Sequence, residues 1–246
     1  MRADPSDQQQ LLELQLIDTT ATQLERARLT LPVHARLDAL TRARLAAHDH
    51  LVTVMTEHAD LKREVAKADA DVQLVRDRAA RDQGHLDSGR GTAKELTALQ
   101  HELASLARRQ SELEEVELEL MERAEAAESG LAQARTALAE IEADIATAQE
   151  ERAEQVAELG ARLAEVLAPR GALVGSLSAD LVALYEKLRA SHDGVGAAPL
   201  HARRCLGCQL ELNAADIARI RAAAADEVLR CEECNRILVR TAESGL

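Results

Sequence analysis

A heptad repeat of apolar side chains runs along most of this chain. Between residues 37 and 79, apolar side chains recur at alternating steps of four and three, as at Leu61, Val65 and Ala68. The same alternation returns between residues 96 and 148. Steps that average about 3.5 residues keep one stripe of an α-helix turned toward a neighbouring helix, and the helices wind into a left-handed supercoil. The repeat therefore predicts long coiled-coil helices.

Polar residues interrupt this repeat. Arg44 and His58 occupy seam positions of the first stretch, where either would set the register of the helices. We expect both instead to extend out of the seam, so that their polar ends reach water. After residue 148 the phase slips through Arg152 to Val156. Two successive steps of four resemble an insertion that locally unwinds the supercoil.

The amino-acid composition favours the same kind of fold. The 246 residues include no Phe, no Trp and one Tyr, which is Tyr185. A globular core of this size normally uses aromatic side chains for bulk. A long coiled coil does not need them, and its usual excess of Ala, Glu, Leu and Arg is present here.

The segment between the two stretches, residues 84–92, predicts a turn because it contains three glycines. Thr92 followed by Glu95 is the pattern of a capping box, which starts the second helix. Two long helices joined by a short turn form an antiparallel hairpin that buries its own seam. Such a hairpin is stable as a monomer and is also compatible with a homodimer.

The helical part has two further breaks. An earlier apolar segment, residues 7–30, ends where Pro32 must kink or stop the helix. We expect this segment to fold against the far end of the second arm. Pro169 and Gly171 end that arm. Residues 1–194 are therefore assigned to a coiled-coil helical hairpin.

Four cysteines, the only ones in the chain, form two Cys-x-x-Cys pairs near the C-terminus. Each pair offers two thiolates from a tight turn, and two such turns complete a tetrahedral shell for Zn²⁺. Two disulfides and a redox-active pair are the alternatives. The N-terminal residues do not resemble a secretion signal, which disfavours disulfides, and no βαβ pattern surrounds either pair, which disfavours redox activity. The predicted ligands of one structural zinc ion are Cys205, Cys208, Cys231 and Cys234.

Residues 195–246 are assigned to a C4 zinc ribbon, and the fold class is mostly α: a long antiparallel coiled-coil hairpin plus this small β-rich domain. Gly207 and Asn235 are the residues expected at positive φ in the two cysteine turns. A domain of about fifty residues can bury only a small core, and the ribbon should therefore depend on zinc for its fold. Strands are expected at Leu200–Arg204, Gln209–Leu212, Glu227–Leu229 and Ile237–Arg240, with a helix at Ala214–Ala224.

The formal net charge of −13 lies in the helical part, because acidic and basic residues balance after residue 195. An acidic hairpin repels nucleic acid and anionic lipid. Any nucleic-acid contact therefore has to come from the ribbon, which has no aromatic side chain to stack on bases. The candidate contacts to nucleic acid or to a partner protein are Arg203, Arg204, Arg219 and Arg221 in the ribbon, and Arg90 and Lys94 at the hairpin turn.

Several functional classes lack their sequence signals. No apolar run approaches the roughly 18 residues of a membrane-spanning helix, so we expect a cytoplasmic protein without membrane contact. No Gly-rich phosphate loop, Ser/His/Asp arrangement or open metal site occurs. We therefore expect no enzymatic activity and no small-molecule substrate. Four thiolates leave no coordination position for water, so the zinc site should stabilise folding only.

The order of these elements resembles a bacterial family of coiled-coil hairpin proteins that end in a four-cysteine zinc ribbon. The hairpin turn and the helix after it, Ser88–Gln100 and Leu113–Glu122, carry one part of the resemblance. The segment Tyr185-Glu-Lys-Leu-Arg189 and the two cysteine pairs carry the other. The family commonly has Gly after the last cysteine, where this chain has Asn235.

Members of this family in flagellated and chlamydial bacteria are known as partners of the alternative sigma factor sigma-54 and of flagellar or secretion-system components. One branch also binds a flagellin messenger RNA. The resemblance implies an interaction protein, without carrying those particular partners over to this chain. We expect a non-enzymatic regulatory adaptor whose hairpin and ribbon contact proteins of the transcription or secretion machinery. The alternative is a regulator that binds RNA or DNA through the ribbon.

Overall fold

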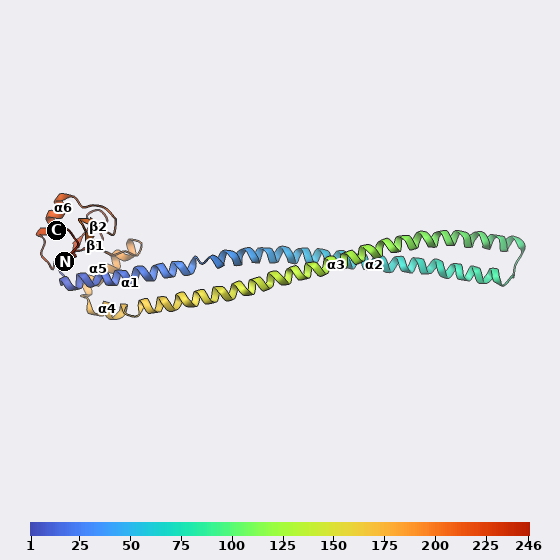
Figure 1. Cartoon of the computed structure of the whole chain (residues 1–246), viewed down its shortest axis with the longest axis horizontal. Helices are drawn as coiled ribbons and strands as arrows, with labels where there is room; N and C mark the ends of the chain where they lie inside the picture. Colours follow the sequence, from blue (N-terminus) through green and yellow to red (C-terminus); the bar gives the residue numbers. More distant parts are fainter. The chain divides into compact units, whose positions relative to one another are not determined.

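The two heptad stretches form two long helices, α2 (Pro32–Asp87) and α3 (Ala93–Leu167). The computed structural model describes residues 1–246 and divides into two compact units, of which residues 35–149 are the hairpin unit. Within this unit α2 and α3 lie side by side and run in opposite directions (Figure 1). Ion pairs of 2.7 Å join Arg76 to Glu114 and Arg78 to Glu102 across the two helices. The predicted antiparallel hairpin is confirmed.

The seam of the hairpin is filled by the residues that the heptad repeat places there. Apart from Arg44, every seam position between 37 and 79 and between 96 and 148 is buried or half-buried. Arg44 is exposed, as expected. His58 is half-buried and lines a groove beside the seam together with Ala124 of α3.

The turn of the hairpin is shorter than the sequence indicates, because α2 continues through Gly84. Gly89 and Gly91 reverse the chain with φ values of +61° and +144°, a region that glycine enters without steric cost. The predicted capping box then starts α3. The backbone N–H of Thr92 donates to Oε2 of Glu95 at 2.7 Å, and the N–H of Glu95 donates to Oγ1 of Thr92 at 3.3 Å.

The second unit, here called the ribbon unit, combines residues 1–34 with residues 150–246. Helix α1 stops before Pro32 and α3 stops before Pro169, as the prolines predict. No helix in the structure combines the length and apolar character needed to cross a membrane. Besides the last part of α3, the helices of this unit are α1 (Pro5–Leu29), α4 (Arg170–Ser176), α5 (Ala179–Ser191) and α6 (Ala214–Ala222).

The ribbon contains a four-stranded sheet in the order β2-β1-β4-β3. Its strands are β1 (Ala197–His201), β2 (Arg204–Cys205), β3 (Leu229–Arg230) and β4 (Ile237–Val239). Strands β1 and β4 pair in parallel, and the two outer pairs are antiparallel. The strand predicted at Gln209–Leu212 does not form, since Gln209 has a φ of +64°, which an extended strand excludes. Glu211 makes only an isolated bridge to Arg204.

Helix α1 packs on the short helices and on the sheet. Its Leu11 and Leu14 belong to one buried cluster with Leu181 and Tyr185 of α5 and Ile237 of β4. The apolar pattern of residues 7–30 predicts a helix here but does not indicate these partners. This core joins the first helix to the ribbon. The ribbon unit therefore includes residues 1–34 and 150–194, which are assigned to the hairpin domain from the sequence alone.

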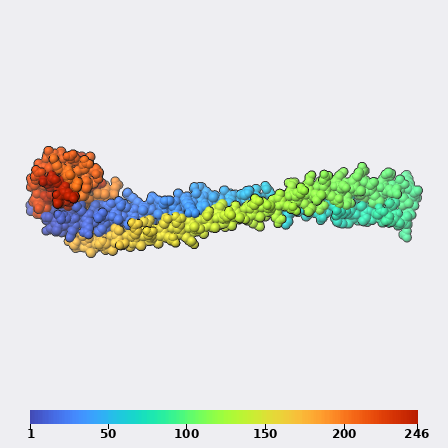
Figure 2. Space-filling model, viewed as in Figure 1, coloured from blue at the N-terminus to red at the C-terminus, as the bar shows by residue number.

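The N-terminal residues add a short pairing to the edge of the ribbon. The backbone N–H of Ala3 donates to the carbonyl of Asp226 at 2.8 Å, and the N–H of Val228 donates to the carbonyl of Met1 at 3.1 Å. Figure 2 shows the blue N-terminal segment of the chain beside the orange and red surface of the ribbon. The ribbon is therefore completed by residues from both ends of the sequence.

Candidate metal centre

The four cysteine side chains converge on one point of the ribbon. Their Sγ atoms all lie within 4.8 Å of one another. The distance is 3.9 Å between Cys205 and Cys234 and 3.8 Å between Cys208 and Cys231. Four sulfurs at about 2.3 Å from a tetrahedral Zn²⁺ lie about 3.8 Å apart, whereas a disulfide requires about 2.0 Å. The donor set and its spacing therefore fit one structural zinc ion and do not fit disulfides.

The two cysteine pairs sit on turns of the same design, which we call the first knuckle (residues 205–210) and the second knuckle (residues 231–236). In the first, the N–H of Gln209 donates to the carbonyl of Cys205 at 2.8 Å. In the second, the N–H of Asn235 donates to the carbonyl of Cys231 at 2.8 Å. Gln209 and Asn235 have φ values of +64° and +60°. The residue after the second cysteine of each pair therefore takes the left-handed conformation.

This geometry confirms the expectation for Asn235 and corrects the one for Gly207, which has no positive φ. Gly207 is needed for a different reason. A Cβ atom at this position would lie 2.9 Å from Cδ of Arg236 and 3.0 Å from Cβ of Ala198. Glycine therefore lets the first knuckle approach β1 and the Arg236 side chain closely.

The surroundings of the thiols explain why they need a cation. Burial raises the pKa of the Cys205 thiol well above its usual value, although backbone N–H groups of the first knuckle act in the opposite direction. Burial also raises the pKa of Cys231. At Cys234 the effect of burial is outweighed by hydrogen bonds from Arg236, and the pKa is lowered. Zn²⁺ supplies the positive charge that holds all four as thiolates.

Arg236 connects the first knuckle to the segment that follows α5. Its Nε donates to the carbonyl of Val195 at 2.9 Å, and its Nη atoms donate to the carbonyls of His192 at 3.2 Å and Gly207 at 3.3 Å. One guanidinium group thus ties both knuckles to the helical part of the ribbon unit.

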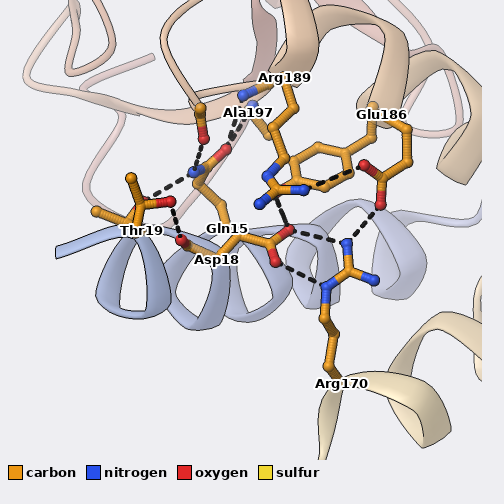
Figure 3. Close-up of polar contacts among 11 residues, drawn as sticks. Gln15, Asp18, Thr19, Arg170, Glu186, Arg189 and Ala197 are labelled. Atoms are coloured by element: carbon orange, nitrogen blue, oxygen red, sulfur yellow. Dashed lines mark hydrogen bonds and ion pairs between the residues drawn. The ribbon is translucent and has the colours of Figure 1, made fainter. Parts of the chain in front are cut away.

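A buried polar junction joins α1 to α4 and α5 in the same unit (Figure 3). Asp18 of α1 is 1% exposed. Arg170 donates to its Oδ1 at 2.7 Å and to its Oδ2 at 3.2 Å, and the hydroxyl of Tyr185 donates to Oδ2 at 2.8 Å. Nε of Arg189 lies 3.3 Å from Oδ2, and Glu186 accepts from both arginines. Two carboxylates and two guanidinium groups therefore balance one another.

The charged partners fix the protonation of this junction. The hydrogen bond from Arg170 to Asp18 raises the pKa of the guanidinium further above its usual value. Burial, and next the hydrogen bond to Asp18, raise the pKa of Tyr185. The phenol therefore stays a neutral hydrogen-bond donor. Every acidic group in the junction is already engaged with a partner of the same chain, so the arrangement serves to hold three helices together.

Gln15, one turn before Asp18, fastens the segment between α5 and β1. Its Nε2 donates to the carbonyl of Gly194 at 2.9 Å, and its Oε1 accepts from the N–H groups of Gly196 at 2.7 Å and Ala197 at 3.2 Å. One side chain thus satisfies backbone groups that would otherwise be buried without partners.

The structure leaves the remaining candidate residues at the surface. The four candidate arginines of the ribbon are exposed, and so are both candidates at the hairpin turn; they are Arg203, Arg204, Arg219, Arg221, Arg90 and Lys94. Arg219 is held in an ion pair of 2.6 Å with Glu232, which reduces its availability for phosphate. Arg203 lies in the turn between β1 and β2 with a φ of +64°.

Sequence reasoning missed the polar junction. Asp18, Gln15 and Arg170 stand in helical patterns that look like solvated surface. One signal was present, because the only aromatic residue of the chain, Tyr185, opens the segment Tyr185–Arg189, which supplies three members of the junction.

Comparison with known proteins agrees with this architecture. The model of the CT398-like coiled coil hairpin domain matches residues 14–193, and that of the C4-type zinc ribbon domain matches residues 204–238. The uncharacterized protein Rv2229c of Mycobacterium tuberculosis is 37% identical over 240 residues, which cover 98% of each chain.

Solved structures show the same fold. A protein from Mycobacterium smegmatis superimposes with a TM-score of 0.86 and 38% identity, covering 98% of this chain and 100% of that one. CT398 from Chlamydia trachomatis superimposes with a TM-score of 0.68 and 20% identity, covering 96% and 98%. At this lower identity the likeness concerns the fold alone. The chain belongs to the family of CT398-like coiled-coil hairpin proteins and ends in a C4-type zinc ribbon.

Proposed function

We propose that this chain is a non-enzymatic interaction protein whose hairpin and zinc ribbon contact other proteins. The observation that carries the proposal is a set of exposed apolar side chains on a hairpin whose seam is already filled. They lie outside the heptad seam of α2 and α3, and exposed apolar patches of this kind mark interaction surfaces. Each is at least 41% exposed: Leu45, Val52, Met55, Leu74, Val116, Leu118 and Met121.

The metal centre supports a role without catalysis. Four thiolates from two knuckles complete the zinc shell, so no position is left for a substrate or an activated water. The zinc ion would hold the two knuckles together and thereby the sheet on which the ribbon surface depends. We further propose that the chain acts in the cytoplasm, where reducing conditions keep the thiols available to zinc. By family resemblance, its partners belong to the transcription or secretion machinery.

Affinity purification of the full-length chain from its host tests this function. We expect a reproducible protein partner, and three variants assign the surface that holds it: Arg90→Ala with Lys94→Ala at the hairpin turn, Leu118→Ser with Met121→Ser on the hairpin, and Cys231→Ser in the ribbon. Loss of the partner with one variant locates the contact. If the wild-type chain yields no reproducible protein partner, the proposed function is wrong.

Nucleic-acid binding is the second candidate. The observation that favours it is the exposure of Arg203, Arg204 and Arg221 on the ribbon. Phosphate contacts by these arginines predict a gel shift of the full-length chain with RNA or DNA at low salt, and the affinity should fall steeply as salt increases. Arg203→Ala with Arg204→Ala should weaken binding to all sequences and lower the salt dependence. No shift at low salt excludes this role.

A further inference from the structure

The exposed apolar side chains of the hairpin gather on one of its sides. With Val65 of α2 and Ala124 of α3 at heptad position a, most of them occupy positions b and e. In an antiparallel helix pair, the e positions of the two helices border the same side of the seam. Leu74 and Val116, at positions c and g, are the exceptions. The apolar side therefore presents Leu45, Val52, Met55, Leu118 and Met121.

A groove of about 200 Å³ lies on this side, between α2 and α3. Val65, Met121 and Ala124 give it an apolar lining, and His58 and Lys62 border it on α2. On α3 the groove is bordered by Glu125 and Glu128.

The exposed apolar residues extend this groove along both helices. On α3, Leu118, Met121 and Glu125 follow at steps of three and four, so they share one helix face. On α2, Met55 and His58 share a face with the lining residues in the same way. From residue 118 to residue 128 the face is about 15 Å long at about 1.5 Å per residue. This is enough for about three turns of an α-helix laid along it.

The charge around the groove selects among occupants. Residues 112–128 of α3 include many glutamates and a single basic residue, Arg123. The facing stretch of α2, residues 58–65, has balanced charge. The groove therefore lies in an acidic field that attracts a cationic partner. A second copy of this chain would bring the same glutamates against one another, which disfavours a homodimer through this side.

We propose that this groove is the docking site for a cationic amphipathic helix of a partner protein. The proposal rests on the function proposed above and names its surface and the chemistry of its partner. A helix fits because side chains at i, i+3, i+4 and i+7 can enter a groove between two helices, while its basic residues meet the glutamates of α3. Met55 and Met121 suit such a surface, because the flexible thioether side chain adapts to different partners.

Binding of synthetic peptides to the full-length protein tests the proposal. One peptide of about 18 residues has leucines at i, i+3, i+4 and i+7 and lysines elsewhere, and two controls have glutamate in place of lysine or the same composition in scrambled order. We expect only the amphipathic lysine peptide to bind. Leu118→Ser with Met121→Ser should weaken its binding at least about tenfold. Leu74→Ser with Val116→Ser, which also removes two exposed apolar side chains but at the other heptad positions, should change it less than about twofold.

Three outcomes of the peptide experiments overturn the proposal: equal binding to both double variants, equal binding of the scrambled peptide, or binding of the glutamate peptide. A homodimer in solution that Leu118→Ser with Met121→Ser dissociates also overturns it, because the groove then holds a second copy. These outcomes are separate from failure of the proposed function. A partner that co-purifies with the chain and is lost only with the Cys231→Ser variant leaves the interaction role intact and places it on the ribbon.

Discussion

The hydroxyl group of Tyr185 donates a hydrogen bond of 2.8 Å to Oδ2 of Asp18, and both side chains are buried. The two residues are 167 positions apart, so this bond ties the first helix to α5. Tyr185 is also the only Tyr in a chain without Trp or Phe. Its fluorescence and absorbance therefore report on the ribbon unit alone, while circular dichroism reports mainly on the long helices.

Removal of the Asp18 carboxylate should destabilise the ribbon unit. Asp18→Ala leaves the hydroxyl of Tyr185 without its acceptor and leaves Glu186 as the one carboxylate facing Arg170 and Arg189, so the free energy of unfolding should fall by about 3 kcal/mol. Urea titration followed by Tyr185 fluorescence measures the change. Glu13→Gln, an exposed carboxylate on the same helix, should shift stability by less than about 0.5 kcal/mol. Equal midpoints for the two variants would show that the junction does not stabilise the unit.

Alkaline pH should destabilise the same unit. Burial and the hydrogen bond to Asp18 raise the pKa of Tyr185, so the folded protein keeps this proton where the unfolded chain, with a pKa of about 10, releases it. The contribution of Tyr185 to stability is complete below about pH 10 and falls by about 1.4 kcal/mol per pH unit above it. Tyrosinate absorbance should therefore appear only together with unfolding. Gradual ionisation near pH 10 in the folded protein would contradict this prediction.

Zinc removal should unfold the ribbon and leave the helicity of the hairpin largely intact. Cys205 and Cys231 belong to the buried cluster of the ribbon, whereas the seam of residues 35–149 contains no metal ligand. Chelation should change the fluorescence of Tyr185, because Ile237 and Val239 of the sheet pack in the same core. The far-ultraviolet circular dichroism should change little. A parallel loss of both signals would falsify the prediction that the hairpin stays folded without zinc.

Two glycine substitutions should have opposite effects. A Cβ atom at Gly196 would lie 2.6 Å from the carbonyl oxygen of Tyr185 and 2.8 Å from its Cδ2. Gly196→Ala should therefore destabilise the ribbon unit by about 2 kcal/mol. Gly84 lies inside α2 with nothing within 4 Å of its Cβ position, so Gly84→Ala should stabilise the helix by about 0.5–1 kcal/mol. Thermal unfolding of both variants measures the signs, and destabilisation by Gly84→Ala would contradict the open environment seen here.

The features that the sequence predicts are those set by neighbours in the chain. The heptad seam, the capping box between Thr92 and Glu95 and the zinc ligands each depend on spacings of a few residues. The left-handed conformation of Gln209 was missed because glycine two positions earlier was the better candidate by residue type.

Contacts across the ribbon unit have no local signal. Asp18 and Gln15 occupy the face of α1 that packs on α5 and β1, and only the three-dimensional arrangement shows that this face is buried. The pairing of Ala3 with Asp226 likewise joins two short segments with no alternating pattern. The apolar periodicity of residues 7–30 predicts that a helix forms there. It does not predict which elements the helix packs against, because those contacts join residues far apart in the chain.

The distance in sequence between α1 and its partners has a consequence for biosynthesis. Gln15 bonds to Ala197, which is 182 residues later. At about 5–20 residues per second, a ribosome needs on the order of ten seconds or more to make that partner. During this time the apolar face of α1 has no native surface to cover it, while the two arms of the hairpin can already associate. The nascent chain should therefore depend on a holdase chaperone at its first helix until the cysteines emerge and take up zinc.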